Sequence, residues 1–107
     1  MAIPYWRNAA EFAAGHSVRV ALEAHPGFLV YNVETLQRLR SSTSNAIGID
    51  FDPSHLYWQG VHIPTAISAL GNAIFHVHAK DVAMCRHNLD TNGVLDTKSY
   101  LRVKERS

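Results

Sequence analysis

The feature that most constrains this chain is a set of three short apolar runs, each of which leads to a residue able to bind a metal ion. The runs and their ligands are Val18–Leu22 with Glu23, Ile47–Phe51 with Asp52, and Ile74–Ala79 with His78. The second ligand follows the first by 29 residues, and the third follows the second by 26. Such an interval holds about one strand, one helix and two loops, which is the repeat of a parallel βα array.

Helical signals fill the segments before and between these runs. Tyr5–Ala14 carries an apolar stripe at helical spacing, and Asn32 suits the N-cap of a helix over Val33–Arg40. A third helix is predicted over Pro64–Leu70, whereas the polar stretch 87–97 is predicted to be a loop. Apolar strands that alternate with helices predict an α/β fold with a parallel sheet, in which ligands bind beyond the carboxyl ends of the strands.

Composition limits the classes of protein and partner. A length of 107 residues suits one domain, and 47% apolar residues suit a folded core. The single cysteine, Cys85, and a start without a secretory signal favour a cytoplasmic location. No apolar run reaches the roughly 20 residues that span a bilayer. A net charge of +1 with scattered basic residues argues against a nucleic-acid surface, and the mildly basic tail 98–107 is expected to begin a solvated helix.

Glu23, Asp52 and His78 form a candidate metal site, because the carboxyl ends of parallel strands meet at one edge of a sheet. Two carboxylates with one imidazole suit Mn²⁺, Mg²⁺ or Co²⁺, and the lack of thiolate ligands makes a zinc site the weaker interpretation. For any one of the three residues, a helix cap or a loop salt bridge is an equally ordinary explanation. The regular spacing of all three is what favours the metal hypothesis.

Four further polar residues lie close to these ligands in the sequence. His55 follows Asp52 by three residues, and it either polarises a substrate oxygen beside the metal or bonds to the backbone of a loop. His76 shares the strand face of His78, with the flanking apolar residues on the opposite face, and is interpreted as an interior histidine with an orienting role as the alternative. Lys80 and Asp81 are expected to neutralise one another.

Three motifs carry a resemblance to a known family. They are LEAHPG at Leu22–Gly27, FDPSHLYWQG at Phe51–Gly60 and HVHAKD at His76–Asp81, and the stretch GVLDTK at 93–98 adds to the resemblance. In this order and spacing they resemble the sugar phosphate isomerase/epimerase family, the xylose isomerase-like group of (β/α)8 barrels. The resemblance covers nearly the whole chain. It implies that residues 1–107 are a partial TIM-barrel domain with about three parallel strands, since a complete barrel needs about 250 residues.

The resemblance also implies a chemistry. In such enzymes a divalent metal is held by Glu, Asp, His and a second Glu at the ends of four successive strands. Glu23, Asp52 and His78 match the first three ligands, and His55 matches a histidine that contacts substrate oxygens. Glu23 and the second glutamate would exchange a proton at the carbon beside a carbonyl, through a metal-stabilised enediolate. The implied reaction is isomerisation or epimerisation of a sugar or keto-sugar, with or without a phosphate.

The sequence departs from the family at one point. No strand end in this chain offers the second glutamate, since Glu11 and Glu105 both lie in predicted helices. We therefore expect that these 107 residues do not complete the catalytic site alone. The alternatives are a non-catalytic remnant that needs a partner segment, an inosose-type dehydratase, or an endonuclease IV-like metal enzyme, which Asp52–His55 also resembles. Open sheet edges in such a segment predict self-association.

Overall fold

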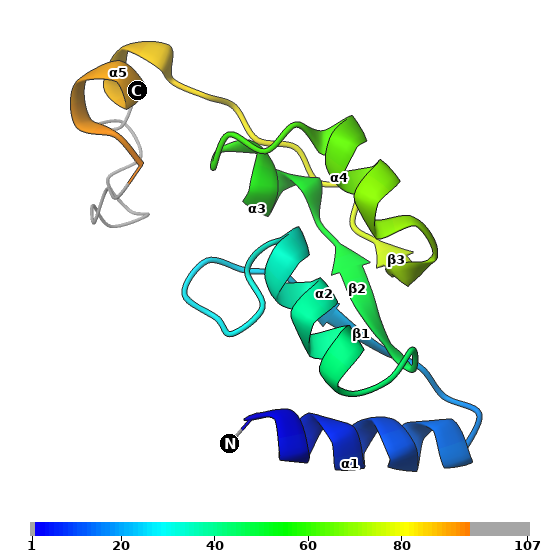
Figure 1. Cartoon of the computed structure of the whole chain (residues 1–107). Coiled ribbons are helices and arrows are strands. Elements are labelled where there is room, and N and C mark those ends of the chain that lie inside the picture. The colour runs from blue at the N-terminus through cyan, green and yellow to red at the C-terminus, as the bar shows by residue number, and fades with distance from the viewer. Residues whose placement is uncertain (1, 95–107) are drawn as a thin grey trace.

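The structure, a computed structural model, describes residues 2–94 (Figure 1). The predicted helix start over 98–107, and the part of the 93–98 motif after Val94, lie outside the described residues. In chain order the elements are α1 (Ala2–Gly15), β1 (Val20–Glu23), α2 (Val33–Ser42), β2 (Ile47–Phe51), α3 (Pro53–Tyr57), α4 (Ile63–Leu70), the 3₁₀ helix η1 (Gly71–Ala73), β3 (Ile74–Val77) and α5 (Arg86–Asn92).

The three strands form one sheet in the order β1-β2-β3, and both pairs are parallel. This arrangement confirms the predicted α/β fold with three parallel strands and intervening helices. The β1-β2 ladder runs from Val20 opposite Ile47 to Glu23 opposite Asp50. Because both neighbours run parallel to β2, all three strands end at the same edge of the sheet, and the segments that carry polar side chains leave from that edge.

One face of the sheet packs against helices and forms the core. Ile47, Ile49 and Phe51 alternate along β2 and are almost completely buried, as are Leu36 of α2 and Leu70 of α4. Figure 1 shows α1, α2 and α4 arranged around the sheet, whereas α5 stands apart at the upper left. No residue of α5 is buried. The central strand therefore supplies the apolar surface on which the helices assemble.

Local sequence signals set the ends of the helices. Asn32 caps α2 through a capping box: its Oδ1 accepts a hydrogen bond from the Thr35 backbone N–H at 2.9 Å, and its own N–H donates to Thr35 Oγ1 at 3.1 Å. Gly71 ends α4 with a φ of 50°, a conformation that glycine adopts at little cost.

Among residues 2–94, no helix is long and apolar enough to cross a membrane.

A short helix, α3, forms where the sequence predicted only a loop. The Asp52 side chain accepts a hydrogen bond from the Ser54 backbone N–H, and Pro53 occupies the first helical position. These are standard start signals for a helix, so α3 begins directly at the end of β2. The strand bounds also differ slightly from expectation, since β1 starts two residues later and β3 ends two residues earlier than predicted.

The predicted polar loop at 87–97 is also wrong over its described part, because α5 occupies Arg86–Asn92. An ion pair one helical turn apart, Arg86 Nε to Asp90 Oδ1 at 3.1 Å, supports this helix. Gly93 follows it with a φ of 72°, a conformation that favours glycine and that ends the helix here.

A bulge in the β2-β3 ladder changes which side chains face which way. Ile49 lies opposite Ile74 and Asp50 lies opposite His76, so Phe75 has no partner residue on β2. The Phe75 ring packs over Gly48 instead, on the sheet face that carries His76. The expectation that Phe75 lies on the face opposite His76 is therefore wrong. An extra residue in one strand shifts the alternation of side chains by one position.

Gly48 is required by this packing, and its replacement tests the bulge. A Cβ at Gly48 would lie 2.6 Å from the Ala73 carbonyl oxygen and closer still to the Phe75 ring. We expect Gly48→Ala to lower the free energy of unfolding by about 1–3 kcal/mol, because backbone and ring must shift to admit the methyl group. Urea unfolding followed by circular dichroism measures this change.

Gly15→Ala is the matched control, since a Cβ there meets no atom within 4 Å and the residue lies in α1. It should leave stability unchanged or raise it by up to about 1 kcal/mol. Equal stabilities for the two variants would contradict the packing of Phe75 against Gly48.

Candidate metal centre

The carboxyl edge of the sheet brings together the three residues predicted as metal ligands. Glu23 is the last residue of β1, Asp52 directly follows β2, and His78 directly follows β3. One ligand atom from each of the three lies within 4.8 Å of the others. Two anionic oxygens and one imidazole nitrogen at this separation need only small side-chain movements to reach a common divalent ion.

Asp52 is the buried member of this group, with a side chain that has no exposed surface. Its two oxygens have different partners. Oδ1 accepts hydrogen bonds from the Ser54 backbone N–H at 2.9 Å and the Ser54 hydroxyl at 2.6 Å, which fixes the carboxylate at the start of α3. Oδ2 accepts a hydrogen bond from Lys80 Nζ at 2.7 Å. The helix cap therefore orients the side chain and leaves Oδ2 pointing toward the site.

The charge of Asp52 follows from these contacts. Burial by itself would raise its pKa, but the hydrogen bonds from Lys80 and Ser54 outweigh burial and lower the pKa from 3.8 to about 2. In turn, the hydrogen bond to Asp52 raises the pKa of Lys80. Asp52 is thus ionised throughout the neutral range, the state in which a carboxylate binds a metal ion.

Lys80 does not pair with Asp81 as the sequence predicted. Its ammonium group reaches across to Asp52 instead, whereas Asp81 Oδ1 accepts a hydrogen bond from the Val82 backbone N–H at 2.8 Å. The reason is geometric: Lys80 leaves β3 beside the end of β2, where the Asp52 carboxylate is already fixed. The ammonium neutralises the oxygen that a metal ion would bind, so a metal ion at this oxygen would compete with Lys80.

His55 lies at the centre of the group. The first turn of α3 places its Nε2 3.1 Å from Glu23 Oε1, 3.4 Å from Asp52 Oδ2 and 3.4 Å from Lys80 Nζ. The same nitrogen donates to Glu23 when it carries a proton and accepts from Lys80 when it does not. A group that can exchange a proton with a neighbouring carboxylate is suited to contact a polar substrate at this point.

A second group of ligand-type side chains lies beside the first and was missed by the sequence interpretation. His76 Nδ1 is 2.9 Å from Asp50 Oδ1, and His78 Nε2 is 3.2 Å from Asp50 Oδ2. Ligand atoms of Asp50, His76 and His78 also lie within 4.8 Å of one another. The sequence did contain a signal for this group: Asp50 is an acidic residue inside an apolar strand. It lies two positions before Asp52, and residues two apart along an extended chain point to the same face.

Other candidates from the sequence lie away from these groups. Glu11 is exposed on α1, and Glu105 lies outside the described residues. Cys85 is a free, exposed thiol. His25, to which the sequence gave no role, does approach the site: its ring centroid is 4.4 Å from that of His55. The candidate ligands thus come from three strands and the residues that directly follow them.

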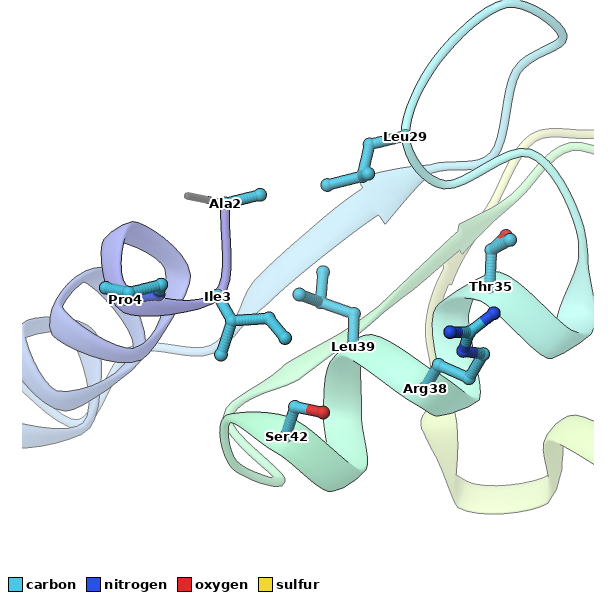
Figure 2. A pocket seen from close by; sticks show the side chains of 8 residues that line it. All are labelled: Ala2, Ile3, Pro4, Leu29, Thr35, Arg38, Leu39 and Ser42. Atoms are coloured by element: carbon cyan, nitrogen blue, oxygen red, sulfur yellow. The ribbon is translucent and has the colours of Figure 1, made fainter.

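Two surface cavities are found, and neither is lined by a candidate ligand. A cavity of about 490 Å³ lies between the start of α1, the β1-α2 loop and α2 (Figure 2), and none of its lining residues is a candidate ligand. A second cavity of about 340 Å³ adjoins the site through Lys80. It is lined by Pro53, Ser54, Tyr57, Ile63, Lys80, Asp81 and Val82.

A parallel α/β sheet with convergent polar residues beyond the carboxyl ends of its strands is the class of arrangement found in TIM-barrel proteins. Comparison with known families agrees: the family described as Xylose isomerase-like TIM barrel matches residues 1–103. The chain therefore belongs to the xylose isomerase-like TIM barrel family.

A similar protein from Bacillus subtilis is about three times as long as this chain. The chain is 46% identical over 99 residues to Uncharacterized protein YfiH of Bacillus subtilis (strain 168). The matched region covers 92% of this chain and 32% of YfiH, so the chain spans about a third of the length of that relative. Three parallel strands are correspondingly fewer than the eight of a closed barrel.

The lowered pKa of Asp52 predicts how stability depends on pH. Because this carboxyl titrates below its ordinary value of 3.8, its contribution is fully present above about pH 4 and is lost as the pH falls through about 2. Allowing for the screening of half-exposed Lys80, the loss amounts to about 1–2 kcal/mol. Urea unfolding at several pH values between 5 and 2 measures it.

Asp52→Asn is the control for this measurement, since an asparagine still accepts the Ser54 hydrogen bond as a helix cap. Its stability should fall less steeply with acid than that of the unchanged chain, over that same interval. Parallel pH profiles for the two proteins would mean that Asp52 is not held ionised by Lys80.

Proposed function

We propose that residues 1–107 are a partial barrel domain that supplies three of the metal ligands of a sugar or keto-sugar isomerase or epimerase. The single observation that carries this proposal is the convergence of Glu23, Asp52 and His78 from three successive strand ends to within 4.8 Å. Membership of the xylose isomerase-like family supports it. The substrate would be a small sugar, with or without a phosphate.

The donor set suits a divalent ion of the harder kind. Two carboxylates and one imidazole favour Mn²⁺, Mg²⁺ or Co²⁺, and zinc fits less well in the absence of thiolates. Asp52 meets the requirement for an ionised ligand, and the Lys80 ammonium that now neutralises it would have to give way to the metal ion. When bound, the metal would stabilise negative charge that develops on a substrate oxygen.

The protein's own groups then have distinct tasks. Glu23, half-exposed on the open face, would take a proton from the carbon beside the substrate carbonyl. His55 would donate a hydrogen bond to a substrate oxygen, since its Nε2 faces the group of ligands. Returning the proton needs a second carboxylate. Among residues 2–94 the other glutamates, Glu11 and Glu34, lie on helices α1 and α2, so the second carboxylate belongs to another part of the barrel.

Other functions receive less support. A dehydratase would use the same ligands on a related substrate and is distinguished by its product. A DNA-cleaving enzyme calls for a basic groove, and a net charge of +1 does not favour one. The free thiol of Cys85 fits a reducing, cytoplasmic location.

β1 and β3 each pair on one side only within the described sheet, so self-association through these edges is part of the proposal for the chain by itself.

Metal binding is the direct test of the ligand assignment. We expect Mn²⁺, titrated by electron paramagnetic resonance, to bind one site and to lose at least 10-fold in affinity in Asp52→Asn and Glu23→Gln. Glu34→Gln and Asp90→Asn are matched controls on exposed helix surfaces and should bind Mn²⁺ unchanged. Equal affinity in all four variants would refute the assignment.

Catalysis requires the complete barrel, and two variants separate the tasks of the residues. In a protein that contains this segment and the remaining strands, His55→Gln should slow exchange of the substrate proton with solvent deuterium by about 10²-fold with Mn²⁺ affinity largely retained. Glu23→Gln should remove both exchange and Mn²⁺ binding. The 107-residue chain alone should show no turnover, and measurable epimerisation by it would contradict the need for a second carboxylate.

A further inference from the structure

We propose that Asp50, His76 and His78 form a second divalent-cation site, which shares His78 with the Glu23, Asp52 and His78 group and prefers Zn²⁺, with Co²⁺ as its spectroscopic probe. The site lies on the open face of the sheet, on the neighbouring strands β2 and β3 and the residue that follows β3. Two of its three residues take no part in the proposed isomerase centre. The second site can therefore be tested separately from the proposed isomerase function, although the two groups share His78.

The contacts around Asp50 have the geometry of a chelate. His76 Nδ1 lies 2.9 Å from one carboxylate oxygen and His78 Nε2 lies 3.2 Å from the other. Donor atoms that share an ion at bonds of about 2.1 Å are themselves about 3 Å apart, so the two nitrogens and the carboxylate already have ligand spacing. A small rotation of the rings admits an ion among them.

The backbone holds these side chains in place before any ion binds. Asp50 lies on the central strand, which is paired on both sides. The bulge that leaves Phe75 without a partner brings His76 directly opposite Asp50. His76 and His78 are two residues apart and project from the same face, with ring centroids 5.3 Å apart. The donor set is thus built by sheet register and does not depend on a loop adopting a special shape.

Exposure leaves room for further ligands. The Asp50 side chain is only 18% exposed because the two rings lie over it, whereas the His76 side chain is 63% exposed and that of His78 43%. An ion held at the Asp50 carboxylate would therefore keep open positions toward solvent, which water molecules or an anionic ligand would fill.

The donor chemistry differs from that of the neighbouring group. Two imidazoles with one carboxylate suit Zn²⁺, whereas two carboxylates with one imidazole suit Mn²⁺ and Mg²⁺, and Co²⁺ fits both donor sets. His78 is common to both sets, with Nε2 near Asp50 and Nδ1 3.8 Å from Glu23 Oε1. A neutral imidazole has a single nitrogen lone pair, so His78 serves one ion at a time. Occupation of the Asp50 site would thus withdraw His78 from the other group.

Cobalt titration followed by visible absorption tests the proposal, since Co²⁺ bound by imidazoles gives ligand-field bands. The unchanged chain should bind one Co²⁺ with such bands, and Asp52→Asn should retain them with affinity changed less than about 3-fold. His76→Gln and Asp50→Asn should each weaken Co²⁺ binding by at least 10-fold. His16→Gln, an exposed histidine at the end of α1, is the matched control and should behave as the unchanged chain.

The opposite pattern overturns the proposal. If Asp52→Asn abolishes the Co²⁺ bands and His76→Gln leaves them intact, the ion occupies the Glu23, Asp52 and His78 group. Absence of Co²⁺ bands in the unchanged chain overturns it as well, and the contacts of Asp50 are then hydrogen bonds only. Circular dichroism of each variant shows whether it folds, and Asp50→Asn decides the matter if His76→Gln does not. Mn²⁺ affinity measured in the same variants reports separately on the isomerase centre.

Discussion

Parallel pairing of β2 with both of its neighbours is the interaction on which the rest of this structure depends. It buries the apolar side chains of the central strand against α2 and α4, and it sets the carboxyl ends of three strands at one edge. Residues 26 and 29 positions apart in the sequence thereby become neighbours within 4.8 Å. The candidate site is thus a consequence of sheet register, with the helices serving mainly to cover the opposite face.

Charge compensation makes this arrangement of acidic and basic groups tolerable. Asp52 is buried, and an unpaired buried carboxylate would be costly, but Ser54 and Lys80 satisfy both of its oxygens. The network continues through His55 to Glu23. Because these hydrogen bonds orient the side chains, the main change on metal binding would be replacement of the Lys80 ammonium at Asp52 Oδ2.

The open face of the sheet links the two proposals. His78 stands between two ligand groups, one rich in carboxylates and the other rich in imidazoles. The proposed isomerase centre also needs a second carboxylate, which residues 2–94 do not place at this face. These residues place donor atoms at three adjacent strand ends, and under the two proposals the metal ion that is offered would decide which group binds it.

The sequence by itself determined the three parallel strands, the placement of three ligand-type residues at strand ends, and three helices. These were predicted over Tyr5–Ala14, Val33–Arg40 and Pro64–Leu70 and extend over 2–15, 33–42 and 63–70 in the structure. These follow from local signals: apolar runs, caps and regular spacing. Only the tertiary structure decided that Lys80 pairs with Asp52, that a bulge turns Phe75 toward Gly48, and that Asp50 joins His76. Those contacts depend on register between strands, which residue order within one strand does not specify.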